Sequence, residues 1–330
     1  MKSTFHVVPL LIALIFGSQI EASKAQTSQI YNKPLKIVVG FPPGGSADTL
    51  ARVLAQQLGA IAPSVIVENK PGAGGRIALE AVKNSEADGA TLVMTPASMV
   101  AVYPHIYRKL PYDPVTDFSP VGRVAAAPFI LAVGPQVPVD VKSLSDFIKW
   151  GKANPALASY GSSGAGSIPH FTGVALGKAS GLDWAHVAYK GAAPAMNDLL
   201  GGQIAANVSV MSNALPHVQA GKLRALAVSS AQRNPSLPSV PTFAEAGAKE
   251  AAAVEWFGLF APARTPVDVI NRLSQALNAA ERSKPFQDAL AKGGFDPVGA
   301  DTPSRFANAL KADIHRWGQL VRSSGFTPED

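Results

Sequence analysis

A Gly/Pro-rich turn between a short apolar run and a helix-like run constrains the fold of this chain more than any other stretch. This turn, residues 41–48 (FPPGGSAD), is called the first loop here; it follows the apolar residues 35–39 and precedes the helical pattern of residues 49–58. A buried strand that ends in such a turn and leads into a helix is typical of α/β folds. Backbone N–H groups at a helix start lack intrahelical partners, so the turn is suited to binding a carboxylate or phosphate. Such turns also occur without a ligand.

A second stretch has the same character. Residues 160–170 (YGSSGAGSIPH), called the second loop, are rich in glycine and serine and follow another short strand pattern. Small residues allow the backbone to approach a ligand closely. Because the two loops lie more than a hundred residues apart in the sequence, we expect them to belong to two structural units that close on one small anion.

The alternation of strand and helix patterns extends over the chain from Pro34 onward. Apolar strands at residues 35–39, 65–68 and 91–94 each end in a loop of small or polar residues, and open parallel sheets bind ligands at the carboxyl ends of their strands. Two longer apolar runs, 121–133 and 254–262, are interpreted as crossings between two units. We therefore predict an α/β clamshell with a parallel sheet and helices on both faces. Residues 34–125 plus 256–330 form one lobe, and residues 126–255 form the other.

Composition excludes several classes of function. The chain has 330 residues, a net charge of +6 without any run of Lys or Arg, and no cysteine. A nucleic-acid-binding patch is therefore not expected, nor are disulfides, a thiolate nucleophile or a Cys-ligated metal.

The N-terminus has the pattern of a secretory signal peptide. Lys2 precedes an apolar run at residues 7–17, and the small residues Ser23 and Ala25 fit a cleavage site after Ala25, with Ala22 as a second possible site. The apolar run is too short to span a bilayer stably. We expect residues 1–25 to be removed and the remaining chain to be exported as a soluble protein; an uncleaved anchor is the alternative.

Motifs of catalysis are absent from both loops. The serines of the second loop lack the two flanking glycines of a nucleophile elbow, and His170 lies only three residues after Ser167. Neither loop contains the lysine of a phosphate-binding P-loop, and the stretch 72–77 lacks the last glycine of a dinucleotide fingerprint. No histidines are paired at metal-ligand spacing. We therefore expect neither an enzyme nor a cofactor or metal.

A series of motifs in a specific order resembles one family. Its members here are the first loop and the segments 68–75, 110–113, 117–121, 161–170, 189–191, 199–202, 221–228 and 238–247. Together they resemble the Bug proteins, the periplasmic solute receptors of tripartite tricarboxylate transporters, over about residues 34–325. The resemblance implies a periplasmic location and a type II periplasmic-binding-protein fold that closes on a small carboxylate-bearing solute.

The resemblance also implies which residues contact the solute. One carboxylate is held between residues 42–48 and 162–170, partly through ordered water, and the rest of the solute faces residues 95–98 and the segments after Tyr189 and Asn207. The candidate ligand-binding residues are Gly44, Gly45, Ser46, Asp48, Thr95, Ser98, Ser162, Ser163, Gly166, Ser167 and His170. For Asp48 we favour a role in capping amides over direct contact, and for His170 a role as a hydrogen-bond anchor.

Several alternatives stay open at the level of sequence. The receptor could deliver its solute to the membrane subunits of a transporter, or dock on a sensor kinase when liganded; in either case we expect a monomer. The solute could be a small dicarboxylate, an amino acid, an aromatic acid or a nicotinate-like compound. Arg76 is interpreted as a solvated residue at a helix start, with pairing to a second carboxylate as the alternative. Val174 stands where this family commonly has an acid, and Trp256 and Phe257 are interpreted as core residues.

Overall fold

The structure is a computed structural model that describes Met1, residues 31–324 and residues 326–328. Apart from Met1, the predicted signal peptide lies outside the described residues. Within the part of the chain that is described, no helix is both long enough and apolar enough to cross a membrane.

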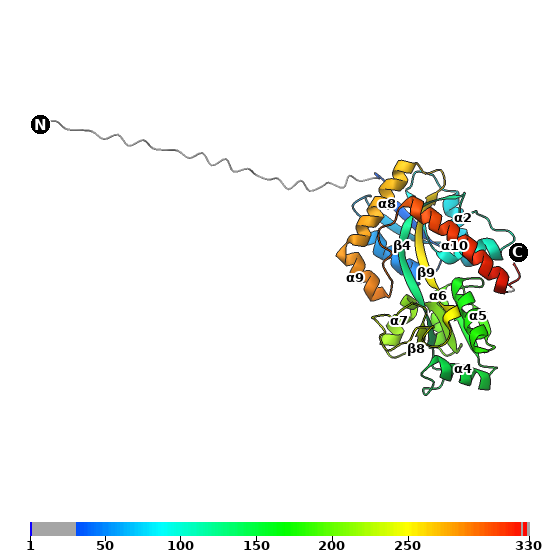
Figure 1. Cartoon of the computed structure of the whole chain (residues 1–330). Helices are drawn as coiled ribbons and strands as arrows, with labels where there is room; N and C mark the ends of the chain where they lie inside the picture. Colours follow the sequence, from blue (N-terminus) through cyan, green and yellow to red (C-terminus); the bar gives the residue numbers. More distant parts are fainter. Residues whose placement is uncertain (2–30, 325, 329–330) are drawn as a thin grey trace.

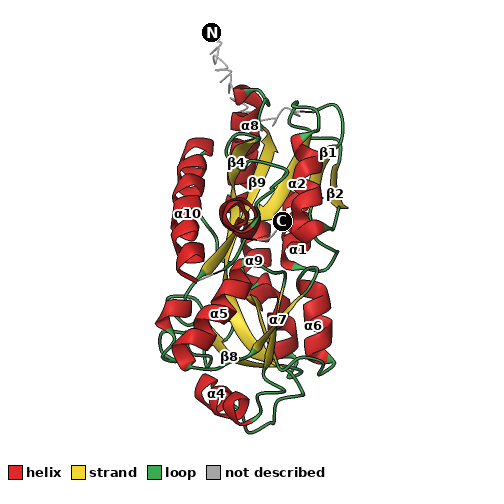
Figure 2. Cartoon of the chain, turned by 90° about the vertical axis from the view of Figure 1, so that its right-hand side faces the viewer, coloured by secondary structure: helices red, strands yellow, loops and turns green. Residues whose placement is uncertain are grey.

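The chain folds into two α/β lobes, which lie one above the other in Figure 1. The upper one, lobe one, contains three parallel strands in the order β2-β1-β3, and β3 pairs antiparallel with β9, one of the two crossing strands. Figure 2 shows α10 on one side of its strands and α1 and α2 on the other. The elements of lobe one are β1 (Leu35–Val39), α1 (Ser46–Gln57), β2 (Val65–Asn69), η1 (Ala73–Gly75), α2 (Arg76–Lys83), β3 (Thr91–Pro96), η2 (Ser98–Val102), α3 (Tyr103–Ile106), α8 (Val267–Arg282), α9 (Lys284–Gly293) and α10 (Pro303–Ser324).

Lobe two is smaller and is built in the same way. Its strands β7, β5 and β6 are parallel neighbours, and β8 pairs with β4 on the other side. Its elements are α4 (Leu144–Ala153), β5 (Ser159–Ser162), α5 (Ile168–Ser180), β6 (Ala185–Ala188), α6 (Ala192–Leu200), β7 (Ala206–Val210), α7 (Met211–Gln219), β8 (Arg224–Val228) and η3 (Lys249–Ala251).

Two long strands, β4 (Phe118–Val133) and β9 (Val254–Pro262), join the lobes and run side by side in Figure 1. They pair antiparallel up to Pro128 opposite Val254; from Phe129 onward β4 pairs with β7 and β8 of lobe two. The two predicted crossings are thus confirmed, although they are antiparallel rather than part of a wholly parallel sheet. The exact residues at which one lobe ends and the other begins stay a prediction.

β4 begins three residues earlier than the sequence pattern indicates. Phe118 pairs with Pro262, and the register shifts between Pro120 and Gly122. A bulge tolerates proline because the ladder is interrupted there and no backbone N–H is required.

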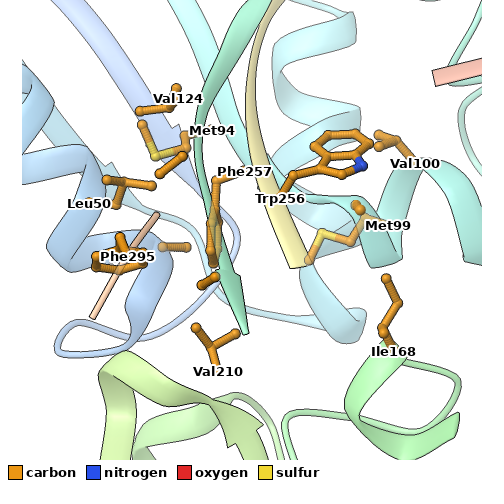
Figure 3. Close-up of a cluster of buried hydrophobic side chains, with 14 of the residues drawn as sticks. Leu50, Met94, Met99, Val100, Val124, Ile168, Val210, Trp256, Phe257 and Phe295 are labelled. Atoms are coloured by element: carbon orange, nitrogen blue, oxygen red, sulfur yellow. The ribbon is translucent and has the colours of Figure 1, made fainter. Parts of the chain in front are cut away.

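A continuous apolar core extends to the junction between the lobes. In the close-up of Figure 3, Met99 belongs to lobe one and Phe257 to the crossing strand β9, while Val210 and Ile168 approach them from lobe two. Trp256 is buried, packs edge-to-face on Phe306 and donates its indole N–H to Asp313 over 2.7 Å. The interpretation as a core residue is confirmed for Trp256; Phe257 is also buried but lines the cavity between the lobes as well.

Candidate functional site

A cavity lies between the two lobes, where the carboxyl ends of their strands meet. Its volume of about 50 Å³ has room for a few water molecules, so a larger solute requires the lobes to open or side chains to move. The residues that line it are Phe41, Pro42, Gly45, Ser46, Ala47, Pro96, Ser98, Tyr103, Ser163, Ser167, Pro169, Ala192, Ser209, Val210, Asn213, Glu255 and Phe257.

Helix N-termini surround this cavity. The first residues of α1 and α5 come from opposite lobes, and the starts of α6 and α7 add Ala192, Val210 and Asn213 to its wall. The end of a helix where N–H groups are unpaired carries a partial positive charge. None of the described residues that line the cavity is a lysine or arginine, so these helix ends are its main source of positive potential.

The first loop is held by a buried carboxylate. Asp48, in the first turn of α1, is 3% exposed and accepts hydrogen bonds from the backbone N–H of Gly44 and from the side chains of Arg52 and Asn69, at 2.9 to 3.0 Å. Burial alone would raise the pKa of Asp48, but the hydrogen bonds from Arg52, Gly44 and Asn69 hold it below its ordinary value. This carboxylate is therefore engaged within lobe one.

The first loop also contacts lobe two directly. Ser46 donates its backbone N–H to Oδ1 of Asn213 over 3.0 Å, and its hydroxyl lies 2.8 Å from the same oxygen and 2.7 Å from the hydroxyl of Ser212. These bonds join the N-terminus of α1 to the N-terminus of α7. The structure is therefore in a closed arrangement, with Ser46 as one of the contacts that close it.

The second loop is held by neutral groups. Ser167 is the N-cap of α5, accepting from the backbone N–H of His170 over 3.4 Å. Nδ1 of His170 accepts from the backbone N–H of Gly166 over 3.0 Å, and its ring stacks on His186 with centroids 3.9 Å apart. Ser162 Oγ lies 2.7 Å from Nε2 of His186. Removal from water lowers the pKa of His170 to about 4 and that of His186 to about 3, so both rings are uncharged at neutral pH.

Two glycines of lobe two allow its backbone to pack closely against lobe one. Gly166 has φ +68°, and a Cβ there would lie 1.8 Å from the side chain of Ile106; Gly191 has φ +116° and packs on Pro42. Glycine is required at these two positions for two reasons: the backbone has a positive φ, and a side chain of lobe one lies close to it.

The segment of residues 95–98 supplies a hydroxyl that bridges the two lobes. Ser98 is buried at the start of η2, donates to Oε2 of Glu255 over 3.1 Å and accepts from the backbone N–H of Ile168 in lobe two over 3.0 Å. Thr95 is also buried, but its hydroxyl contacts Sδ of Met99 over 3.1 Å rather than the cavity.

Comparison with known proteins assigns the family. The model of the TctC family, described as tripartite tricarboxylate transporter family receptor, matches residues 47–326. The chain belongs to this family. The resemblance inferred from the motifs is thus confirmed, and the TctC receptor is a solute-binding protein rather than an enzyme.

Individual relatives agree with this assignment. Protein BugT of Bordetella pertussis is 37% identical over 89% of this chain and 90% of its own length. The structure of the periplasmic binding protein BugD is 31% identical with a TM-score of 0.84, covering 91% of this chain and 100% of that one. The structure of R. palustris Rpa4515 with adipate is 32% identical with a TM-score of 0.85, covering 90% of this chain and 99% of that one. The periplasmic-binding-protein fold is confirmed.

Five of the eleven candidate ligand-binding residues line the cavity of the TctC receptor. The five are Gly45, Ser46, Ser98, Ser163 and Ser167. The other six do not line it; they are Gly44, Asp48, Thr95, Ser162, Gly166 and His170. Contact of the five with a solute stays a prediction. Asp48 and His170 have the geometry expected of residues that fix the loops.

Arg76 lies outside the wall of the cavity. Its guanidinium carbon sits 3.8 Å from the ring centroid of Tyr107, and its Nε donates to the carbonyl of Ala73 over 2.8 Å. The alternative in which Arg76 pairs with a second carboxylate would require this stacking to break. Among the residues that the structure describes, no group of His, Asp or Glu side chains could hold a metal ion.

Four polar residues of the wall were not among the candidates: Tyr103, Ser209, Asn213 and Glu255. Asn213 lies on α7, a short helix that the sequence patterns do not reveal because it contains Pro216 and has the weak helix formers Ser212 and Asn213 in its first turn. The sequence does contain a signal for Glu255. It is an acid within the apolar run 254–262, and a buried acid requires a partner or a function.

Proposed function

We propose that this TctC receptor binds one small carboxylate-bearing solute in the cavity between its lobes and delivers it, as a monomer, to the membrane subunits of a tripartite tricarboxylate transporter. The observation that carries the proposal is the convergence of the N-termini of α1, α5, α6 and α7 on one cavity. Helix N-termini bind anions through unpaired amides and the helix dipole. The related structure of R. palustris Rpa4515 was determined with adipate, which is a small carboxylate.

Closure of the lobes couples binding to a change of shape. A carboxylate between the two loops contacts α1 of lobe one and α5 of lobe two at once, and these contacts exist only when the lobes are closed. A ligand shifts a conformational equilibrium by its differential affinity for the two states. The carboxylate therefore adds to the closing bonds of Ser46 with Ser212 and Asn213, and the closed form is the one presented to the membrane subunits.

A thermal-shift screen tests this function. The exported form is unfolded and refolded to remove carried-over ligand, then heated with organic acids, amino acids, sugars and nucleotides. Native-state binding stabilises by about 2.7 kcal/mol at a hundredfold excess over Kd, so the expected result is a raised melting temperature with carboxylates. A shift with sugars or nucleotides and none with any carboxylate contradicts the proposal.

A pair of glycine variants locates the binding. Gly45 lines the cavity and has φ −82°, a backbone that valine adopts, and a Cβ added there would have no atom nearer than 4.0 Å outside the adjoining residues. Gly45→Val is expected to abolish the shift because the new side chain fills the space of the carboxylate. Gly59→Val, at an exposed glycine with open space around it, is the matched control and keeps the shift. Equal shifts in both variants place the carboxylate elsewhere.

A further inference from the structure

One acidic side chain lines the cavity, and the other described residues of its wall are uncharged. Glu255, on β9, is 2% exposed and lies opposite Ala127 of β4. Its Oε2 accepts from the hydroxyl of Ser98, whereas its Oε1 has no hydrogen-bond partner among the described residues. An unpaired polar atom removed from water is costly, so this oxygen is suited to accept a hydrogen bond from a bound solute.

No charged group of the protein offsets this acid within the described part of the wall. Glu255 and Tyr103 are the titratable side chains among the described residues there. Burial raises the pKa of Glu255 to about 8, and the Ser98 hydroxyl together with the nearby backbone N–H groups of Ala97, Trp256 and Ser98 offsets only part of this effect.

A second unpaired group lies on the same wall. The hydroxyl of Ser209, on β7, is buried and also has no partner among the residues described. The hydroxyl of Ser98, in contrast, is already used twice, toward Glu255 and toward Ile168. The cavity thus combines helix N-termini that suit a carboxylate with an acceptor, Glu255, that suits an N–H donor.

Resting on the proposed function, we propose that Glu255 determines specificity by pairing with an ammonium group of the solute. The solute class is then an amino acid, whose carboxylate faces the helix N-termini and whose nitrogen faces Glu255. A plain dicarboxylate is disfavoured because it cannot form this ion pair: at pH 7 its second carboxylate only accepts a hydrogen bond from protonated Glu255, and no lysine or arginine stands beside it among the described residues of the wall. An ammonium instead satisfies the unpaired Oε1 with a charge-assisted hydrogen bond.

The pairing has a proton balance that can be measured. In the empty cavity at pH 7 the carboxyl of Glu255 holds its proton, since its pKa is about 8. The solute enters with its ammonium intact, lowers that pKa, and the proton of Glu255 passes to the buffer, leaving an ion pair. Affinity for an amino acid therefore rises as pH increases toward 8. A diacid that accepts a hydrogen bond from protonated Glu255 has the opposite dependence, because it needs the proton to stay.

Isothermal titration calorimetry of the refolded protein at pH 7 tests this inference. The probes are matched pairs with and without an amino group: L-aspartate and succinate, L-glutamate and glutarate, and L-phenylalanine and 3-phenylpropionate. Titration in buffers with different ionisation enthalpies reports the protons released. We expect the amino member of at least one pair to bind about tenfold or more tightly than its partner, with release of a proton.

Two variants separate specificity from folding. Glu255→Gln keeps the size and the acceptor for Ser98 but removes the charge, so it is expected to lose the preference for the amino member and the proton release while still binding carboxylates. Glu250→Gln, at an exposed acid of η3 away from the cavity, is expected to behave as the wild type.

Three results overturn the inference. The first is equal or tighter binding of the non-amino member in every pair that binds; the second is an unchanged preference in Glu255→Gln; the third is proton uptake instead of release. In all three cases a carboxylate still binds, so the proposed function stands. Failure of every carboxylate in the thermal-shift screen is the distinct result that contradicts the proposed function, and the inference with it.

Discussion

The two loops that face the cavity are fixed in different ways. The first loop is held by a buried charge, Asp48, which pairs with Arg52 and accepts hydrogen bonds from Asn69 and from the backbone N–H of Gly44, all within lobe one. The second is held by uncharged groups, chiefly the N-cap of Ser167 and the stacked rings of His170 and His186. The difference shows how an acid and two histidines lie near a predicted anion site without setting its charge: the acid is engaged behind the loop, and the histidines are kept neutral.

The largest effect is expected from removing the charge behind the first loop. Asp48→Ala leaves the Gly44 amide and the Arg52 and Asn69 side chains without their acceptor, and is expected to destabilise the protein by about 2–3 kcal/mol. Asp268→Ala is the matched control: it removes the same i,i+4 acid–arginine pair with Arg272 from the first turn of α8, but there the acid is 70% exposed. Its cost is expected to be about 0.5 kcal/mol. Urea denaturation measures both, and equal costs would show that Asp48 does not hold the loop.

The second loop is expected to show a pH dependence that the first lacks. Unfolded histidine has a pKa of 6.5, whereas the folded values are about 4 for His170 and about 3 for His186. The unfolded chain therefore binds more protons below pH 6.5, and stability is lost as pH falls from 6.5 toward 4. The pKa of Asp48 is lowered below its ordinary 3.8, so its contribution is complete above that pH and is lost only in stronger acid.

Melting temperatures at pH 7.5 and 5 measure this contribution. Glu255 and Glu281, whose pKa burial raises to about 8, act in the opposite sense between these two pH values, so the histidine contribution is taken as the difference between the wild type and a matched variant. In the double variant His170→Asn, His186→Gln, amide groups replace the ring nitrogens that face Gly166 and Ser162 but do not titrate. We expect the wild type to lose a few degrees more than this variant when the pH is lowered from 7.5 to 5. An equal change in the two proteins would assign the pH dependence to other groups.

The smallest effect on stability is expected at the contact between the first loop and lobe two. Asn213→Ala removes the acceptor of both Ser46 bonds and favours opening of the empty protein. Small-angle scattering is expected to give a larger radius of gyration than for the wild type. Asn154→Ala, which removes a bond within lobe two, is expected to leave the radius unchanged. Identical radii for the two variants would show that the Ser46 contact does not hold the lobes closed.

Much of the fold could be predicted from the sequence because it depends on local patterns. The apolar runs that became β4 and β9 are long enough to identify as crossings, and the glycine and proline turns at strand ends identify both loops. α5 begins at Ile168, within the second loop. The Ser167 N-cap and Pro169 near the helix start, both compatible with a first turn, indicate the observed start.

The closing contacts could not be predicted because they join distant segments. Ser46 meets Asn213 across 167 residues, and Ser98 meets Glu255 across 157. No local pattern specifies such pairs, and α7 has a sequence that disfavours a helix. Asp48 and His170, in contrast, make bonds to residues four positions away, namely Gly44, Arg52 and Gly166, and their roles as loop anchors were expected.

A crystal structure of the protein with the acid that gives the largest thermal shift is the sharpest test of carboxylate binding between the two loops. We predict one carboxylate of that acid between residues 42–48 and 162–170, within reach of the N-termini of α1 and α5 together. A carboxylate bound to only one loop, or outside the cavity, would contradict this binding mode.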